Sequence, residues 1–265
     1  MTVSIEHSLD REEAFPLLNA FPRSTFFHTP IWLEALVRTF PAFSGGWITE
    51  REGSELVGFM PYIETRKSLF RSLWAMPFGT YGDPVVRSRP TALRLIERFF
   101  EMSSGPGCRR AGASLFCTDV SSGLPGGVNR QTEECRIIEL EGTFDEYRSR
   151  IVRKTRRQVR DKAQRAGVRV KMIDSPDGLA ALYDAYRLGS KDWGGVHPYP
   201  LTLFEELFAL RDEGVVFWGA FLDDEFLGGH IDLYFGGVAQ AWQVGLTERA
   251  SEYGISSMLV FSAVE

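Results

Sequence analysis

The sequence predicts an α/β protein with mixed sheets, built from two similar units. Some segments place apolar residues every three or four positions, which is typical of helices, and others alternate apolar and polar residues, as strands do. Each half of the chain has a helix, then strands joined by Gly- or Asp-bearing turns, then another helix. A chain of 265 residues with 44% hydrophobic and 25% charged content can form two modest globular domains. We place the boundary so that the units span residues 1–135 and 136–265.

The first half is expected to hold three helices and a strand pair. Helices are predicted over residues 10–20 and 89–102 and after Thr29, which can cap a helix that has Pro30 in its first turn. A hairpin is predicted between residues 45–53 and 54–66, and further strands over 113–119 and 134–140.

Residues 76–86 are dense in Gly and Pro and form an ordered functional loop or a plain multi-turn connection, two interpretations that stay open. Tyr81 and Asp83 within it are candidate substrate-binding residues.

The second half repeats this alternation. Strands are predicted over 168–173, 215–223, 225–235 and 238–247, and helices after Ser175 and over 201–214. A Gly/Pro/aromatic loop over 192–200 offers Trp193 and Tyr199, which either stack on a sugar or nucleotide or simply cover the core. The chain ends within a helical pattern, so we expect it to be C-terminally truncated.

A basic helix is predicted over residues 143–167. Thr143 and Glu146 form a capping box, and Gly167 supplies a left-handed stop. Residues 148–165 hold nine Lys and Arg and one acid, whereas the rest of the chain has 21 basic and 34 acidic residues. The positive charge is therefore concentrated in one segment of an acidic protein.

Like charges four residues apart on this helix, such as Arg153 and Arg157, each cost about 0.2–0.5 kcal/mol in an isolated helix. An anionic partner would offset that cost, so Arg153, Arg156 and Arg160 are candidate ligands of a phosphate. The alternative is a solvated helix face, because Arg and Lys are good helix formers.

Several classes of protein are disfavoured. No stretch approaches the ~20 apolar residues of a membrane-spanning helix, and the N-terminal residues lack the pattern of a signal peptide. Three cysteines without a CxxC pair fit reduced thiols in a cytoplasmic protein, and no spacing predicts a metal site. We find no Ser/His/Asp order and no phosphate-binding P-loop.

Four segments carry a resemblance to a known family: FFHTPIWLEAL, MPFGTYGDPVV, RIVRKTRRQVRDKAQRAGVRV, and the pair ELVGFMPY and EFLGGHIDLYF with the final GISSMLVFSAVE. The chain resembles the tandem-GNAT acyltransferases of the FemAB type over most of both halves. The resemblance implies two GNAT-like units facing a cleft.

It also implies transfer of an activated acyl or aminoacyl group to an amine on a cell-envelope precursor related to peptidoglycan or polysaccharide. The co-substrate would be acyl-CoA or aminoacyl-tRNA, with no tightly bound cofactor. The acceptor would be a small phosphate-bearing molecule, and peripheral contact with a membrane is left open.

The resemblance also assigns residues. Arg156 best matches the FemAB-type arginine that contacts a substrate phosphate. The turn with which CoA-dependent GNATs hold a pyrophosphate matches residues 251–256, so Gly254 and Ser256, with Arg249 just before them, are expected to bind the donor. The match has one glycine and no Arg or Gln at its first position. The long helical arm of tRNA-using members is missing from this sequence.

Acyl transfer to an amine needs a deprotonated nitrogen and a polarised carbonyl held in line with it. His230 and Asp232 share one face of a predicted strand, and Gln243 lies on the next, so these three are the candidate catalytic residues. The alternative is that they form an ordinary strand face.

Two other functions stay open at this point. The basic helix could bind RNA or DNA, although its cations are not interleaved with aromatic residues and the rest of the chain is acidic. The protein could also be a catalytically inactive GNAT fold that acts as a binding module.

Overall fold

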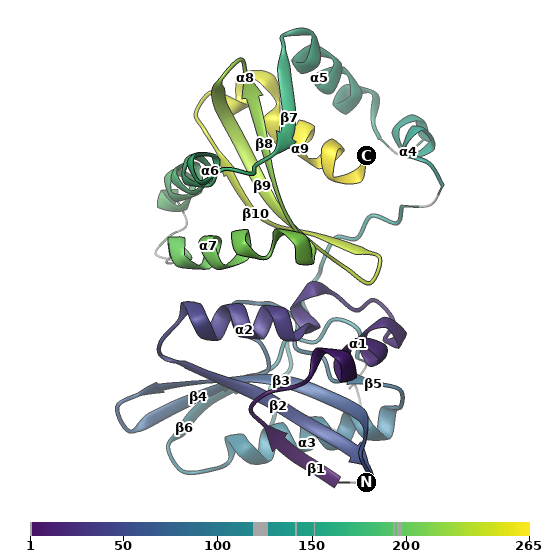
Figure 1. The fold of residues 1–265 in the computed structure, drawn as a ribbon, viewed down its shortest axis with the longest axis vertical. Coiled ribbons are helices and arrows are strands. Elements are labelled where there is room, and N and C mark those ends of the chain that lie inside the picture. The colour runs from purple at the N-terminus through teal and green to yellow at the C-terminus, as the bar shows by residue number, and fades with distance from the viewer. Residues whose placement is uncertain (1, 119–126, 141, 151, 193, 195–197) are drawn as a thin grey trace. The chain divides into compact units, whose positions relative to one another are not determined.

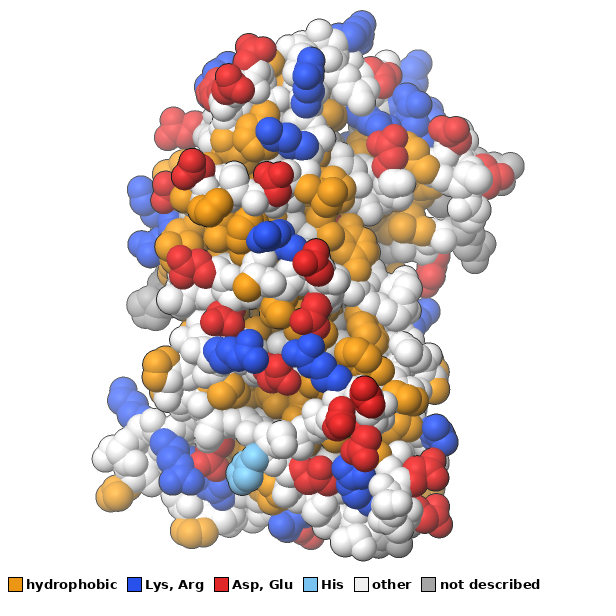
Figure 2. Space-filling model, in the orientation of Figure 1, with side chains coloured by type: hydrophobic (Ala, Val, Ile, Leu, Met, Phe, Trp, Pro, Cys, Tyr) orange, Lys and Arg blue, Asp and Glu red, His pale blue; other side chains and the backbone are white. Residues whose placement is uncertain are grey.

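The computed structural model describes residues 2–118, 127–140, 142–150, 152–192, 194 and 198–265. The chain divides into two compact units, one formed by Met1–Arg130 with Tyr234–Val238 and the other by Gln131–Leu233 with Ala239–Glu265. Each unit has its own sheet and its own helices (Figure 1), which confirms the predicted α/β fold of two units. Side chains of both charges are interspersed over the face seen in Figure 2.

The sheet of the first unit is mixed. β4 and β6 are parallel, whereas β1 with β2, β2 with β3, β3 with β4, and β3 with β5 are antiparallel. The main path runs β1-β2-β3-β4-β6, and β5 pairs with β3. The strands are β1 (Thr2–Glu6), β2 (Phe43–Glu52), β3 (Glu55–Lys67), β4 (Phe70–Trp74), β5 (Val85–Val86) and β6 (Cys108–Gly112).

Side-chain caps begin the helices of this unit. Asp10, Thr29 and Ser88 each accept a hydrogen bond from a first-turn amide, which satisfies a donor that the helix itself leaves open. The helices are α1 (Arg11–Ala20), α2 (Pro30–Thr39) and α3 (Arg89–Ser103). Leu95, Ile96 and Phe99 of α3 are buried in one core cluster with residues of β2, β3 and β4.

The second unit has a four-stranded sheet in the order β10-β9-β8-β7. Phe217 packs on Phe208 of α7, whereas Ala220, which alternation places on the opposite face, clusters with residues of α5 and α9. The strands are β7 (Val168–Met172), β8 (Val215–Leu222), β9 (Glu225–Phe235) and β10 (Val238–Leu246). The helices are α4 (Phe144–Arg150), α5 (Lys154–Arg165), α6 (Pro176–Gly189), α7 (Leu201–Ala209), α8 (Ala250–Tyr253) and α9 (Ile255–Val264).

The predicted basic helix is two helices, so the expectation of one continuous helix over 143–167 is wrong. Arg153 has extended backbone angles (φ −58°, ψ 143°) and begins α5 anew. The guanidinium of Arg157 donates to the carbonyls of Arg148 and Ser149 at the end of α4. These carbonyls lie in the last turn of a helix, where no intrahelical donor reaches them, so Arg157 takes the place of the missing amides.

Two predicted strands are not formed. Residues 113–118 pair with no strand, because the amides of Phe116, Cys117 and Thr118 bind the carboxylate of Asp83 instead. Residues 134–140 are exposed and lie outside any sheet. The strands β1, β4 and β6 are additions that the sequence did not predict. Across the described residues, every helix is too short or too polar to span a bilayer.

Candidate functional site

The candidate site lies at the start of α9. Gly254 adopts the left-handed conformation (φ 62°) between α8 and α9. The amides of Ser257 and Met258 donate to the Gly254 carbonyl, and those of Ile255 and Ser256 lie ahead of these first bonds. Such amides form the positive end of a helix, which favours a negatively charged ligand.

Helix α5 packs directly against this turn. A Cβ atom placed on Gly254 would lie 2.2 Å from Cγ1 of Val159, so α5 approaches as closely as a glycine allows. This contact brings Arg156 beside α9, where its Nη1 donates to Oγ of Ser257 over 2.6 Å. Packing of two helices therefore joins residues that are 101 positions apart in the sequence.

A cavity of about 410 Å³ opens at this junction. Its polar side chains are those of Arg136, Arg156, Ser256 and Ser257. Within the described part of the chain, the Arg156 guanidinium meets a serine hydroxyl and no carboxylate. A cation that is held in place without being neutralised suits a small anion such as a phosphate. Apolar and aromatic residues complete the lining, namely Ile138, Tyr147, Val152, Val260 and Phe261.

Of the three arginines predicted to bind phosphate, only Arg156 lines this cavity. Arg153 is exposed at the cap position of α5. Arg160 is buried, with its guanidinium 5.2 Å from the ring centroids of both Phe144 and Phe261, and it forms an ion pair with Glu265. Two aromatic rings and a carboxylate therefore enclose Arg160, which the sequence predicts to bind a phosphate.

Of the three residues predicted to bind the donor, two lie at the cavity or its turn and one lies elsewhere. Ser256 lines the cavity, and Gly254 forms the turn that admits α5. Arg249 forms ion pairs with Glu225 and Glu252 on the surface, and these hold the pKa of Arg249 above its usual value. The structure thus brings Ser256 together with Arg156, and leaves Arg249 in an ion-pair network of its own.

The three candidate catalytic residues lie on β9 and β10. His230 and Asp232 are 4% and 1% exposed, and Nε2 of His230 lies 3.3 Å from Oδ2 of Asp232 without the alignment of a hydrogen bond. Burial lowers the pKa of His230 to about 4. Gln243 is half buried on β10, the strand next to β9. None of these three lines a cavity described here, and their catalytic role stays a prediction.

The first-half candidates serve the interior of the first unit. Tyr81 is half buried and stacks on Phe116, with centroids 4.6 Å apart. Asp83 is fully buried, and its oxygens accept from Nε2 of His28 and from three backbone amides. Because Asp83 has no exposed surface and its oxygens are already engaged, the structure assigns it to a structural network and not to a ligand.

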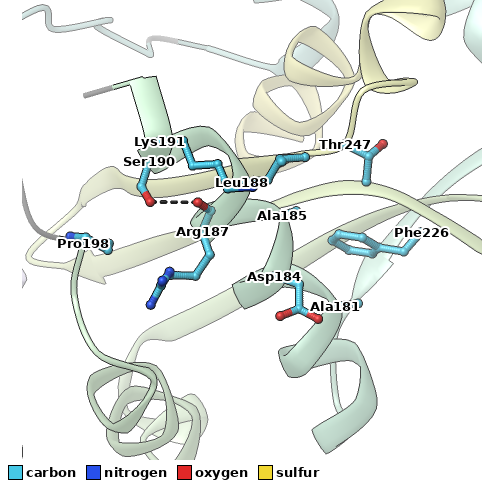
Figure 3. Close-up of a pocket in the computed structure, with 10 residues that line it drawn as sticks. All are labelled: Ala181, Asp184, Ala185, Arg187, Leu188, Ser190, Lys191, Pro198, Phe226 and Thr247. Atoms are coloured by element: carbon cyan, nitrogen blue, oxygen red, sulfur yellow. Dashed lines mark hydrogen bonds between the residues drawn. The ribbon is translucent and has the colours of Figure 1, made fainter. Parts of the chain in front are cut away.

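A larger cavity, of about 700 Å³, lies along α6. Figure 3 shows Asp184 and Arg187 extending from this helix, with Phe226 and Thr247 from the sheet side of the opening. Tyr199 is on the neighbouring loop, where burial raises its pKa to about 12 and its ring lies 5.2 Å from that of Trp242. Trp193 lies outside the described residues. No residue predicted from the sequence as a site residue lines this larger cavity.

Sequence reasoning missed Arg136 and Ser257. Arg136 lies in a segment expected to be a strand, and nothing local indicates that it would meet α5 and α9. Ser257 follows the predicted donor-binding turn directly, so extending that turn by one residue would have included it.

Comparison with known proteins agrees with the fold of both units. Residues 149–265 match the family model of the acetyltransferase (GNAT) domain. The whole chain superposes on FemX with a TM-score of 0.72 at 10% identity, covering 100% of this chain and 85% of FemX. A conserved protein of unknown function from Bacteroides thetaiotaomicron VPI-5482 gives a TM-score of 0.58 at 9% identity, with 99% and 86% coverage. No curated protein matches the sequence.

The family match covers most of the second unit, and the cavity at α9 lies within the matched residues apart from Arg136, Ile138 and Tyr147. The chain as a whole has a FemAB-like GNAT fold, which confirms the resemblance seen in the sequence. The domain match supports an acyltransferase-type function.

Proposed function

We propose that the protein transfers an activated acyl or aminoacyl group to an amine on a cell-envelope precursor, and that the α9 cavity holds a phosphate of the donor. The observation that carries this proposal is the position of Arg156, Ser256 and Ser257 at the start of a helix within a GNAT domain. The turn that the resemblance assigns to the pyrophosphate of CoA is the turn that begins α9. This favours acyl-CoA as the donor, with aminoacyl-tRNA as the alternative.

Acyl transfer to an amine depends more on the positioning of the two substrates than on a covalent intermediate with the protein. The amine nitrogen attacks the acyl carbonyl, the thiolate of CoA leaves, and the nitrogen gives up one proton. His230 and Asp232 are the proposed proton acceptors, but a histidine with a pKa of about 4 is a weak base at neutral pH. A catalytic role for the pair therefore requires that substrate binding opens β9 to the reacting amine.

The test compares Arg156→Ala with Arg153→Ala. Both changes remove one guanidinium from the start of α5, but only Arg156 lines the cavity. A hydrogen bond to a charged group is worth about 1.5–3 kcal/mol, so we expect Arg156→Ala to weaken acetyl-CoA binding by about 10- to 150-fold in calorimetry. Arg153→Ala should bind as the wild type does. Equal affinities of the wild type and the two variants would show that this cavity does not bind the phosphate.

A mass-spectrometric screen of acyl-CoAs and charged tRNAs then identifies the donor. Transfer from charged tRNA alone would identify the donor as aminoacyl-tRNA. Binding of a donor without transfer to any amine would instead indicate an inactive binding module. A nucleic-acid-binding function instead predicts RNA affinity that falls steeply with salt and depends equally on Arg153 and Arg156.

A further inference from the structure

A second basic surface lies in the first unit, at the turn between β3 and β4. Lys67 and Phe70 pair across this turn, and Ser68 and Leu69 form its tip, with Ser68 in a left-handed conformation (φ 57°). The side chain of Leu69 is 87% exposed and that of Phe70 is 42% exposed. A large apolar side chain held at the end of a hairpin points to a role in contact with a partner.

Cations surround this apolar tip. Arg66 and Lys67 precede the turn, Arg71 follows it, and Arg109 and Arg110 come from the adjacent strand β6. Their side chains are exposed except for that of Arg71, which is half buried.

The acidic complement of this surface is small. Glu64 is 8% exposed, and its two oxygens bind Arg66 and Arg71. Five cations against one carboxylate give this surface a charge of +4 in a chain whose net charge is −5. The neighbouring residues 103–107 carry no charge. We call this set, residues 64–71 with Arg109 and Arg110, the hairpin-tip surface.

The tip is held in shape before it meets any partner. The Arg109 guanidinium lies 3.3 Å from the centroid of the Phe70 ring. The Arg71 amide donates to the Gly107 carbonyl, and its guanidinium donates to the Met102 carbonyl. These contacts fix the turn to the end of α3 and to β6, so little conformational entropy is lost when the tip is bound.

We propose that the hairpin-tip surface binds the anionic surface of a lipid bilayer. An exposed leucine and phenylalanine can enter the boundary between headgroups and acyl chains, while the surrounding cations meet lipid phosphates. Each cation near an anionic bilayer increases partitioning by roughly fivefold. A nucleic acid would use the same cations but would have no need of Leu69, and this separates the two partners.

The experiment measures co-sedimentation of the full chain with phosphatidylcholine vesicles, with and without phosphatidylglycerol. We expect binding to the anionic vesicles alone, and a steep decrease with added salt. Leu69→Glu should reduce this binding by at least tenfold. Met172→Glu is the matched control, since Met172 is also a large exposed side chain, at 62%, but lies on β7 of the second unit.

Circular dichroism checks that both variants are folded. We expect both to fold, because the two substituted side chains are exposed. The proposal is overturned if the wild type does not bind anionic vesicles at low salt. It is overturned as well if Leu69→Glu and the wild type bind alike, or if RNA is bound more tightly than the vesicles and independently of Leu69. None of these outcomes depends on the α9 cavity, so they leave the proposed acyl transfer untouched.

Discussion

At the scale of single residues, Asp83 organises the interior of the first unit. Its carboxylate accepts from Nε2 of His28 over 3.1 Å and from the amides of Phe116, Cys117 and Thr118 over 2.7, 2.8 and 2.7 Å. Burial raises the pKa of the Asp83 carboxyl, but the hydrogen bonds from His28 and the amides outweigh it, and the pKa lies below its usual value. The ionised form of Asp83 therefore holds residues 116–118 in place.

Asp83→Asn is expected to destabilise the protein by about 3–5 kcal/mol, because it removes a buried charge and turns an amide NH₂ group toward backbone donors. Asp224→Asn, at an exposed turn, should change stability by less than about 0.5 kcal/mol. Chemical denaturation of both variants measures the difference. Equal stabilities would show that the network around Asp83 adds nothing to the fold.

At the scale of elements, the packing of α5 on the turn before α9 depends on one glycine. Gly254 has φ 62° and its Cβ position is occupied by Val159. Gly53 has nearly the same φ, 61°, but open space around it. The two glycines therefore separate the cost of the backbone conformation from the cost of the helix contact.

We expect Gly53→Ala to cost about 1–2 kcal/mol, the strain of a left-handed non-glycine residue. Gly254→Ala should cost clearly more, because the new methyl group also displaces Val159 and with it α5. The second change should lower affinity for the donor as well, since Arg156 is carried by the same helix. Denaturant midpoints and calorimetry measure the two effects. In the background Val159→Ala, the excess cost of Gly254→Ala should shrink, and an unchanged excess would contradict the contact.

Local sequence signals found the elements that local physics determines. The caps at Thr29 and Ser175 correctly predict the starts of helices, and the Gly-bearing turn at Gly53 correctly predicts a hairpin, because each of these signals acts within a few residues. The predicted strand over 113–119 failed because its amides bind Asp83, more than thirty positions earlier. The break between α4 and α5 was also missed because it depends on a side chain from further along the chain. The guanidinium of Arg157 donates to the last carbonyls of α4, which in a continuous helix would accept from backbone amides.

At the scale of the whole molecule, basic residues are concentrated in the run over 148–165 and at the hairpin-tip surface, and only the first of these is visible in the sequence. The run over 148–165 is dense, yet Arg148, Arg157 and Arg160 bind groups of the protein itself. The hairpin-tip surface is assembled from residues 64–71 and from β6, so no single stretch of sequence predicts it. Of the candidate site, Arg156, Gly254 and Ser256 were predicted from the sequence, whereas the pairing of α5 with α9 required the structure.

The pH dependence of global stability should reveal His230. Burial lowers the pKa of His230 from 6.5 to about 4, so between these values the unfolded chain binds a proton that the folded chain does not. The contribution of His230 is therefore complete above about pH 6.5 and decreases by about 1.4 kcal/mol per unit as the pH falls toward 4. Denaturation at several pH values should show a flatter profile for His230→Gln in this window. Parallel profiles would place the histidine in contact with water.

The guanidinium of Arg157, which binds the last carbonyls of α4, also makes the stability of α4 depend on α5. A helix of seven residues is far too short to persist by itself in water, and the group that satisfies its last carbonyls belongs to α5. We therefore expect α4 to be stable only while α5 is folded beside it. The part of the cavity wall that Tyr147 and Val152 contribute therefore depends on α5 being folded.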